Sequence, residues 1–594
     1  MIVNFVAVSA VAITLTACGG GGHHDDAPPV DPIPPANDYS FVPTPIVTGP
    51  IASESFASET KNYTFFATDI ALPTRGYVEE EFFFEGKANA YDVPNSMGSS
   101  TLPSTFPINV ITPDVPYKTR MVVRRPTDPM KFNGTVVIEW ANVTDGFDGE
   151  YFWVQAKDYL IREGYAYIVV SAQRNGITNA TANLGGLIGF SPTRYGSLDV
   201  TNGQSGDSLS YDIFSQTAKA ARSVPKVLGG LPVKLVMGIG MSQSAGRLGN
   251  YINFVHQRTP IYDSILLQVT GPAVRDDLIP VMKVLSESEA RSANSLNNIQ
   301  DDTPLRHTWF VAGASHGDVI QRMGRTSVRL RDYGLAGTPD DSCSTNPSIL
   351  TRPRTPYRHV LNAAVSHLQK QMTTGAVPPS APRFQTTGSG DTLAVARDSN
   401  NNALGAIRLA HMEVPTAVAD QRECGNPGSW VPFDDAKLNT LYTSHADYVS
   451  KVTAAVNASI DAGFVLPVDG QETIAEAEAS IYGLGLQCGL YCLNASHFKV
   501  DFSSTGLLRE HTVYYNVLNG EDLIQAVDRA HWNTAKGYST TGSTAKNYFN
   551  TAISELQFYS SLVSTARAEG RLTETAANLL VKEANAIIKG LEAL

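Results

Sequence analysis

Basic residues are too few in this sequence to suggest a nucleic-acid partner. Lys and Arg number 45 against 57 Asp and Glu, so the formal net charge is −12 at pH 7. Proteins that bind nucleic acids neutralise backbone phosphates with clustered Lys and Arg side chains. Charged residues make up only 17% of the 594 residues, whereas 42% are hydrophobic. The composition therefore argues against nucleic acid and predicts a large packed core with additions, or several domains.

After its amino-terminal segment, the sequence lacks any apolar stretch long enough to span a bilayer. The segment itself is mostly apolar and ends in Leu15-Thr16-Ala17 before Cys18. This pattern resembles a bacterial lipoprotein signal, in which Cys18 becomes the lipidated amino terminus. A plain secretory signal is the alternative, and the absence of Lys and Arg before Cys18 counts against both. We expect an outer-membrane or cell-surface lipoprotein held by lipid alone, or a periplasmic or secreted protein if Cys18 carries no lipid.

Cysteine is scarce, which excludes a disulfide-dense small scaffold. Besides Cys18 there are four: Cys343, Cys424, Cys488 and Cys492. An even number in an exported protein predicts two disulfides, for which three pairings are possible. The local spacing favours Cys488 with Cys492, and hence Cys343 with Cys424. A metal site at Cys488 and Cys492 is the alternative, but no second pair has comparable spacing, so we expect no metal.

The most informative stretch is Gly-Met-Ser-Gln-Ser at 240–244, which follows an apolar run at 235–239. Apolar residues at helical spacing come after it, so the pattern predicts a strand, a sharp turn at Ser242 and a helix. Such a turn requires small residues two positions before and after the serine, as Gly240 and Ser244 are. Ser244 is an alternative nucleophile in another register, but the full-length strand ending at Gly240 favours Ser242.

Alternating strands and helices predict an α/β fold with a mostly parallel sheet. Strand-like segments at 77–85 and 117–125 are rich in aromatic and β-branched residues and indicate an antiparallel start. Apolar runs then alternate with amphipathic segments, as expected for βαβ units. The predicted parallel strands are 134–140, 165–171, 235–239, 264–269, 279–285 and 308–312, and the intervening helices include 152–162 and 210–224. A serine turn after the third parallel strand is typical of an α/β-hydrolase sheet.

Five motifs also resemble a known family. They are GMSQSA at 240–245, VIEWANV at 137–143, VAGASH at 311–316, RYGSL at 194–198 and the segment 408–417. In combination they are similar to the bacterial alpha/beta hydrolase domain family of esterase-like proteins. The resemblance implies the fold and serine-hydrolase chemistry, but it does not imply a particular substrate.

A serine nucleophile needs a base and an acid, which in this fold follow it in the chain order Ser, Asp/Glu, His. The last predicted strand is followed by a Gly-rich turn with His316, so His316 is the preferred base. The preceding strand is followed by Glu287 and Glu289, and the register favours Glu289 as the acid, with Glu287 as the alternative. His411 and His445 compete with His316 for the role of base.

Two backbone amides should stabilise the oxyanion. The first is that of Gln243 at the start of the helix, and the second should come from the loop near Asn142, after the strand 134–140. The alternative for Asn142 is that its side chain simply closes the turn.

The remaining segments are predicted to be accessory. The predicted domains are a signal at 1–18, a disordered tether at 19–40, the hydrolase core at 41–316, a cap and core-completing segment at 317–465, and a helical module at 466–594. The module ends in a predicted helical hairpin, 545–568 and 573–591.

The sequence therefore predicts a serine hydrolase that cleaves a small-molecule or polymer ester through an acyl-enzyme, without cofactor or metal. Ser242 would attack, His316 would transfer the proton and Glu289 would orient His316. The alternative is a non-catalytic surface binding protein built on a hydrolase scaffold.

Overall fold

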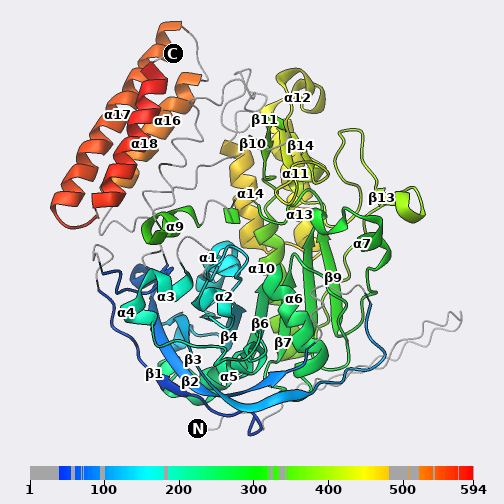
Figure 1. Cartoon of the computed structure of the whole chain (residues 1–594). Coiled ribbons are helices and arrows are strands. Elements are labelled where there is room, and N and C mark those ends of the chain that lie inside the picture. The colour runs from blue at the N-terminus through cyan, green and yellow to red at the C-terminus, as the bar shows by residue number, and fades with distance from the viewer. Residues whose placement is uncertain are drawn as a thin grey trace, which may run out of the picture.

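A nine-stranded sheet forms the centre of the protein (Figure 1). The computed structural model describes residues 39–54, 60–68, 70, 72–93, 101–179, 185–318, 320–321, 325–333, 342–343, 346–479, 508, 521–538, 542–572 and 574–592. In chain order the strands are β1 (Ile46–Thr48), β2 (Tyr77–Tyr91), β3 (Val110–Pro126), β4 (Thr135–Trp140), β5 (Ala166–Val170), β6 (Leu235–Met241), β7 (Ser264–Gln268), β8 (Val281–Ser286) and β9 (Arg306–Val311).

The spatial order is β1-β2-β3-β5-β4-β6-β7-β8-β9. Strands β1, β2, β3 and β5 pair antiparallel, and every pair from β5 through β4 to β9 is parallel. This confirms the predicted α/β-hydrolase sheet with an antiparallel start. The carboxyl ends of β6, β8 and β9 meet at one edge, where loops from distant parts of the sequence come together.

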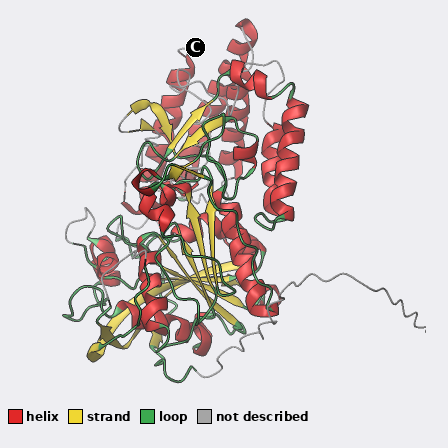
Figure 2. Ribbon diagram, turned by 90° about the vertical axis from the view of Figure 1, so that its right-hand side faces the viewer, coloured by secondary structure: helices red, strands yellow, loops and turns green. Residues whose placement is uncertain are grey.

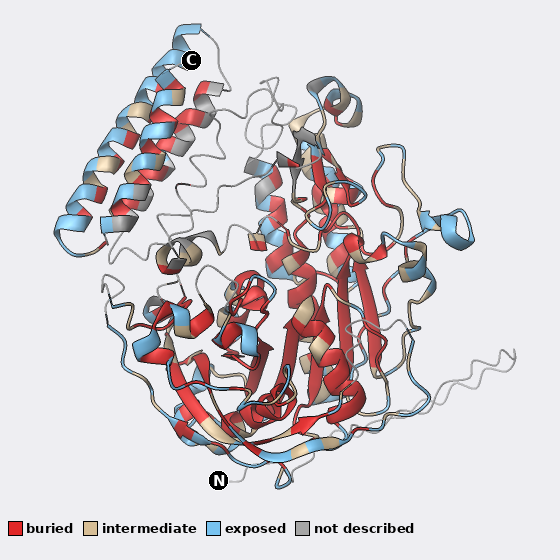
Figure 3. Cartoon of the chain, in the orientation of Figure 1, coloured by how far each residue is buried: buried red, intermediate tan, exposed pale blue. Residues whose placement is uncertain are grey.

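Helices cover both faces of this sheet (Figure 2). Successive side chains of a strand point to opposite faces, so Val136 and Ile138 join one core cluster and Val137 joins the other. The first cluster includes α5 (Ser210–Ser223), and the second includes α1 (Tyr151–Arg162) and α10 (Tyr357–Thr374). The central strands are consequently buried almost throughout (Figure 3), which explains why they read as unbroken apolar runs.

The segment after β9 both completes the core and adds a second, four-stranded sheet. Helix α10 packs against β7 and β8, far from it in sequence. The added sheet has the order β10 (Ser342–Cys343), β11 (Asn346–Thr351), β15 (Ser429–Pro432) and β14 (Ala417–Asp420). A disulfide joins Cys343 to Cys424, with a Cα–Cα distance of 5.2 Å, so this predicted pairing is confirmed. Cys488 and Cys492, the other predicted pair, lie outside the described residues.

Helix α14 (Pro467–Ala479) contacts helices of the preceding segments. Its Asp469 bonds to Arg162 of α1 at 2.9 Å and to Asn362 of α10 at 2.8 Å. It also packs against α13 (His445–Asp461).

The carboxyl-terminal helices have a core of their own. They are α16 (Glu521–Tyr538), α17 (Gly542–Ala568) and α18 (Glu574–Glu592), the last two forming the predicted hairpin (Figure 1). Leu523, Leu556 and Leu580 are completely buried in their shared apolar cluster. Within the part of the chain that the structure describes, no helix combines the length and the apolar character needed to cross a membrane.

Candidate active site

Ser242 stands at a strained turn between β6 and α6 (Gln243–Asn250). Its φ of 55° and ψ of −114° are rare for a residue with a side chain, and they direct the chain abruptly from the strand into the helix. The turn is tight: a Cβ on Gly240 would lie 2.8 Å from backbone atoms of Ser244 and Ala245. Only glycine at position 240 fits this approach of strand and helix.

The other serine of the motif is sequestered. Ser244 Oγ donates to the carbonyl of Met241 and accepts from the Met241 amide, both at 3.0 Å. Its side chain is completely buried. The structure thus holds Ser244 in a local backbone role and leaves Ser242 at the turn.

His316, which follows β9, connects Ser242 to Glu289. Its Nε2 lies 2.8 Å from Ser242 Oγ, and its Nδ1 lies 2.7 Å from Glu289 Oε1. Because an ionised carboxylate only accepts hydrogen bonds, Nδ1 carries the proton and donates to Glu289. Nε2 is then an acceptor, and the Ser242 hydroxyl donates to it. The His316 amide also donates to Ser288 Oγ at 3.1 Å, which fixes the start of the loop.

Glu289 is held by the turn that follows β8. Its second oxygen, Oε2, accepts from the amide and the hydroxyl of Ser286, at 2.8 and 2.7 Å. This arrangement is a capping box at the start of a short 3₁₀ turn (Glu287–Ala290). Since Oε2 is occupied, Oε1 is free to face His316. One sequence feature, the carboxylate three residues after Ser286, therefore both caps the turn and orients the imidazole.

Glu287, the alternative acid, points elsewhere. Its Oε2 accepts from the Gly313 amide at 2.8 Å, and its Oε1 lies 2.6 Å from Arg397. Burial raises the pKa of the Glu287 carboxyl, and the nearby Arg397 guanidinium opposes this shift. Glu287 thus braces the turn that precedes His316 without touching the imidazole.

The two competing histidines lie in other surroundings. His411 is half-buried among residues of the segment after β9, and desolvation lowers its pKa to about 4. His445 begins α13, and its Nε2 lies 3.1 Å from the carbonyl of Ala477 in α14. Of the three histidines considered, His316 is the one bonded to Ser242.

Asn142 closes its own turn. Its side chain donates to the Met241 carbonyl at 2.7 Å and accepts from the Thr144 amide at 2.9 Å. Its backbone amide donates to the Gly149 carbonyl at 3.0 Å, so that amide is already engaged. The next amide, that of Val143, faces the Gln243 side chain at 3.5 Å, a distance too long for a good hydrogen bond.

The amide of Gln243 has no hydrogen-bond partner within its own helix. As the first residue of α6, it has no carbonyl four residues earlier within the helix to bond. The Gln243 side chain is itself fixed, because its Nε2 donates to Gln173 Oε1 at 3.0 Å. Trp140 donates to the same oxygen at 3.1 Å. No pattern in the sequence pointed to Gln173, because its contacts with Gln243 and Trp140 join residues that are far apart in the chain.

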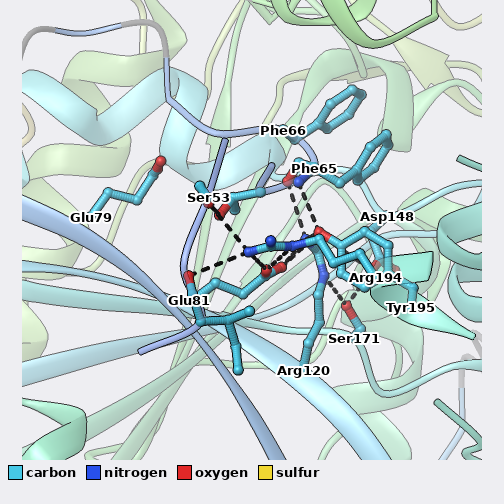
Figure 4. A network of polar contacts seen from close by, with 12 residues as sticks. Ser53, Phe65, Phe66, Glu79, Glu81, Arg120, Asp148, Ser171, Arg194 and Tyr195 are labelled. Carbon is cyan, nitrogen blue, oxygen red and sulfur yellow. Dashed lines mark hydrogen bonds and ion pairs between the residues drawn. The ribbon is translucent and has the colours of Figure 1, made fainter. Parts of the chain in front are cut away.

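A buried ionic network braces the loop that carries Asn142 and Val143 (Figure 4). Glu81 accepts from Arg120 at 2.9 Å and from Arg194 at 2.7 Å. Arg120 in turn lies 3.7 Å from Asp148, in the same loop as Asn142. These side chains are almost completely buried. The network gives the RYGSL motif a structural explanation, since Arg194 bonds to the buried Glu81 in the interior.

The sheet order and the strained serine turn define an α/β hydrolase. Comparison with protein families agrees: residues 47–475 match the family described as alpha/beta hydrolase domain. Because this match spans most of the chain, the protein belongs to that family.

Similarity to solved structures is distant. A fungal esterase from Rhizomucor miehei shares 12% identity over 50% of this chain and 85% of its own, with a TM-score of 0.25. A cold-adapted esterase from an Arctic intertidal metagenomic library shares 9% over 39% of this chain and 84% of its own, with a TM-score of 0.22. The rice cell wall degrading esterase of Xanthomonas oryzae shares 14% over 33% and 43%, with a TM-score of 0.19. No curated protein gives a significant match.

Proposed function

We propose that the protein is a serine hydrolase that cleaves carboxylic esters through an acyl-enzyme intermediate. The observation that carries this proposal is the continuous hydrogen-bonded chain from Ser242 through His316 to Glu289. It lies at the carboxyl edge of the parallel strands, where the fold exposes its functional loops. A protein that only binds a ligand has no need of a strained serine bonded to an oriented imidazole.

In the proposed reaction, Ser242 Oγ attacks the ester carbonyl while His316 Nε2 takes the hydroxyl proton. Glu289 stabilises the imidazolium that forms. His316 then returns the proton to the departing alcohol, and a water activated in the same way hydrolyses the acyl-enzyme.

For the oxyanion we propose the backbone amides of Gln243 and Val143. The first lies next to the nucleophile at the amino end of α6, where the helix dipole also favours negative charge. The second replaces our expectation for the Asn142 amide, which Gly149 already occupies. A substrate oxygen would displace the long contact between Val143 and the Gln243 side chain.

Esters are the proposed substrates because their carbonyl is more electrophilic than that of an amide and an alcohol is a better leaving group than an amine. The acyl and alcohol groups can belong to a small molecule or to a polymer.

We also propose that the protein is exported and anchored through lipid on Cys18. The disulfide between Cys343 and Cys424 supports an oxidising compartment. Cys18→Ala should release the protein from the membrane fraction of expressing cells, as measured by fractionation and mass spectrometry of the mature amino terminus. Soluble wild-type protein that begins at another residue would refute the anchor.

The catalytic proposal is tested by labelling the full-length protein with a fluorophosphonate and mapping the modified peptide. We expect label on Ser242, none on Ser242→Ala, and retained label on Ser244→Ala. Label on Ser244 would refute the assignment of the nucleophile. Folded protein that takes no label and hydrolyses no ester would favour a non-catalytic binding protein.

A further inference from the structure

A cavity of about 490 Å³ borders the proposed triad. His316 and Glu289 contribute to its wall. It is also lined by side chains of β8 and β9, including Lys283 and Thr308, and by Gln300. The cavity thus brings the imidazole and the carboxylate of the proposed triad together with polar side chains on the last two strands of the sheet.

Lys283 is an unusual residue for the middle of a buried strand. Its side chain is only 3% exposed. Its Nζ donates to Gln300 Oε1 at 2.7 Å. An ammonium group has three protons to donate, and Gln300 takes one, so donor capacity remains for a molecule in the cavity.

Thr308 is the cross-strand neighbour of Lys283 in the pairing of β8 with β9. Its residue is 4% exposed, and its Oγ1 has no hydrogen-bond partner among the described residues. A buried hydroxyl without a partner costs free energy, and such groups are rare unless a ligand or water satisfies them. Lys283 and Thr308 are therefore neighbouring side chains that both line the cavity, and the Thr308 hydroxyl is a donor that the described residues leave unused.

The charges around Lys283 favour an anion. Arg306 of β9 and Arg383 lie near it, and Asp302 opposes them. Arg306 is paired with Asp276 at 3.0 Å, and Arg383 with Asp302 at 3.3 Å. Among the described charges nearest the ammonium, the two guanidiniums are each matched by a carboxylate, which leaves Lys283 without an acidic partner of its own.

The other titratable groups that line the cavity are Glu289, His316 and Arg291. Glu289 is directed to His316 and Ser286, as described above. Arg291 donates to the Asn426 side chain at 2.7 Å. Glu289 and Arg291 thus have partners other than Lys283.

We propose that this cavity is a subsite for an anionic substituent of the ester substrate, bound by Lys283 Nζ and the Thr308 hydroxyl. A carboxylate matches both donors, since it accepts several hydrogen bonds. The inference rests on the proposed function, and it deepens it by naming the substrate class: esters whose acyl or alcohol group carries a carboxylate or a similar anion.

The electrostatics add a pH signature. Burial, Arg306 and Arg383 lower the pKa of the Lys283 ammonium to about 7. A bound anion restores the charge, so anionic substrates should need the protonated form. The preference for an anionic ester over a neutral one should be constant below pH ~7 and fall about tenfold per pH unit above it. Any effect of pH on the chemical steps common to both esters cancels in this ratio.

The test uses two matched pairs of esters with the full-length protein. In the first the acyl group differs: the para-nitrophenyl monoester of glutarate against para-nitrophenyl pentanoate. In the second the alcohol differs: para-acetoxybenzoate against para-tolyl acetate. The ratio of kcat/KM within each pair is measured for the wild type, Lys283→Met, Thr308→Val and Lys451→Met.

Lys283→Met should lower the ratio for at least one pair about tenfold or more, mainly through KM, and abolish its pH dependence above neutrality. Thr308→Val should lower it severalfold, and the exposed Lys451 of α13 serves as the matched control without effect. Rates on neutral esters should stay within about twofold. Lys283→Met should fold, because Gln300 Oε1 keeps the Val274 amide as a donor at 2.9 Å.

Wild-type ratios near one for both pairs, or ratios that Lys283→Met leaves unchanged, would overturn the subsite while ester hydrolysis and the proposed function stand. Absence of hydrolysis of all four esters, together with absence of fluorophosphonate labelling, would instead overturn the proposed function.

Discussion

Replacing Glu289 by Gln should remove the proposed catalysis without unfolding the protein. The Oε2 position accepts two hydrogen bonds from Ser286, which only an oxygen can do, so the Gln oxygen should remain there. The new NH₂ group then faces His316 Nδ1. Because that group donates, Nδ1 must become the acceptor, and the proton moves to Nε2.

That tautomer cannot take the proton of Ser242. A comparable substitution of a triad acid in another hydrolase lowers kcat about 10⁴-fold with the geometry intact. We expect a loss of the same order for Glu289→Gln, with thermal stability close to the wild type because the capping bonds at Ser286 persist.

Glu287→Gln is the matched control, since it changes the same residue type two positions away. Gln can still accept from the Gly313 amide, but it cannot neutralise Arg397, whose side chain is 12% exposed. Removing one partner of a buried ion pair costs about 3–5 kcal/mol. Asp420 lies 3.9 Å from Arg397 and offsets part of this loss, so we expect about 2–3 kcal/mol.

The two variants are compared by kcat on para-nitrophenyl esters, by the rate of fluorophosphonate labelling and by urea unfolding with the disulfide intact. Glu289→Gln should lose turnover and keep stability, whereas Glu287→Gln should lose stability and keep most of its turnover. Near-normal turnover in Glu289→Gln, combined with a thousandfold loss in a stably folded Glu287→Gln, would refute the tautomer argument and exchange the two roles.

Three further changes test other parts of the structure. Gly240→Ala should cost about 1–3 kcal/mol of stability in urea unfolding and reduce fluorophosphonate labelling, because the new methyl group meets the α6 backbone at 2.8 Å; unchanged labelling and stability would contradict the tight turn. Lys283→Met should be more stable than the wild type below pH ~7. The lowered pKa of Lys283 makes the stability of the wild type rise with pH by about 1.4 kcal/mol per unit between pH ~7 and ~10. The difference in stability between the two proteins should therefore shrink over this window. A constant difference from pH 6 to 10 would argue against a buried ammonium. Cys343→Ser removes the disulfide to Cys424, which spans a sequence separation of 81 residues. This change should destabilise the protein by about 2–5 kcal/mol in urea unfolding. An unchanged stability would show that the disulfide does not contribute to it.

The fold could be predicted because its strands carry a strong local signal. Strands buried on both faces must be apolar along their whole length, so β4, β5, β6 and β7 are visible as runs in the sequence. The contacts of α14 were harder to predict, because Asp469 reaches residues of α1 and α10 that are far away in the chain. That residue is as polar as an exposed helical residue, and only its distant partners reveal where it lies.

The site shows the same division between local and distant information. Chain order and the serine turn sufficed to nominate Ser242 and His316, since both follow directly from strands that the sequence displays. The two carboxylates after β8 could not be separated by spacing alone, because they differ in their partners: Ser286 is local to Glu289, whereas Arg397 is more than a hundred residues from Glu287.

The loop proposed to hold the oxyanion depends most on distant contacts. The amide of Asn142 is engaged because Gly149 lies opposite it, and the loop is fixed in that shape through Asp148 and Arg120. Arg120 belongs to the antiparallel start of the sheet, and Glu81 on the neighbouring strand holds it in place. An ionic network inside the amino-terminal part of the fold therefore determines which of the two neighbouring amides, that of Asn142 or that of Val143, is available as the proposed donor. These contacts form only in the folded chain, so local sequence patterns do not reveal them. They make Val143 a better candidate for the proposed donor than Asn142.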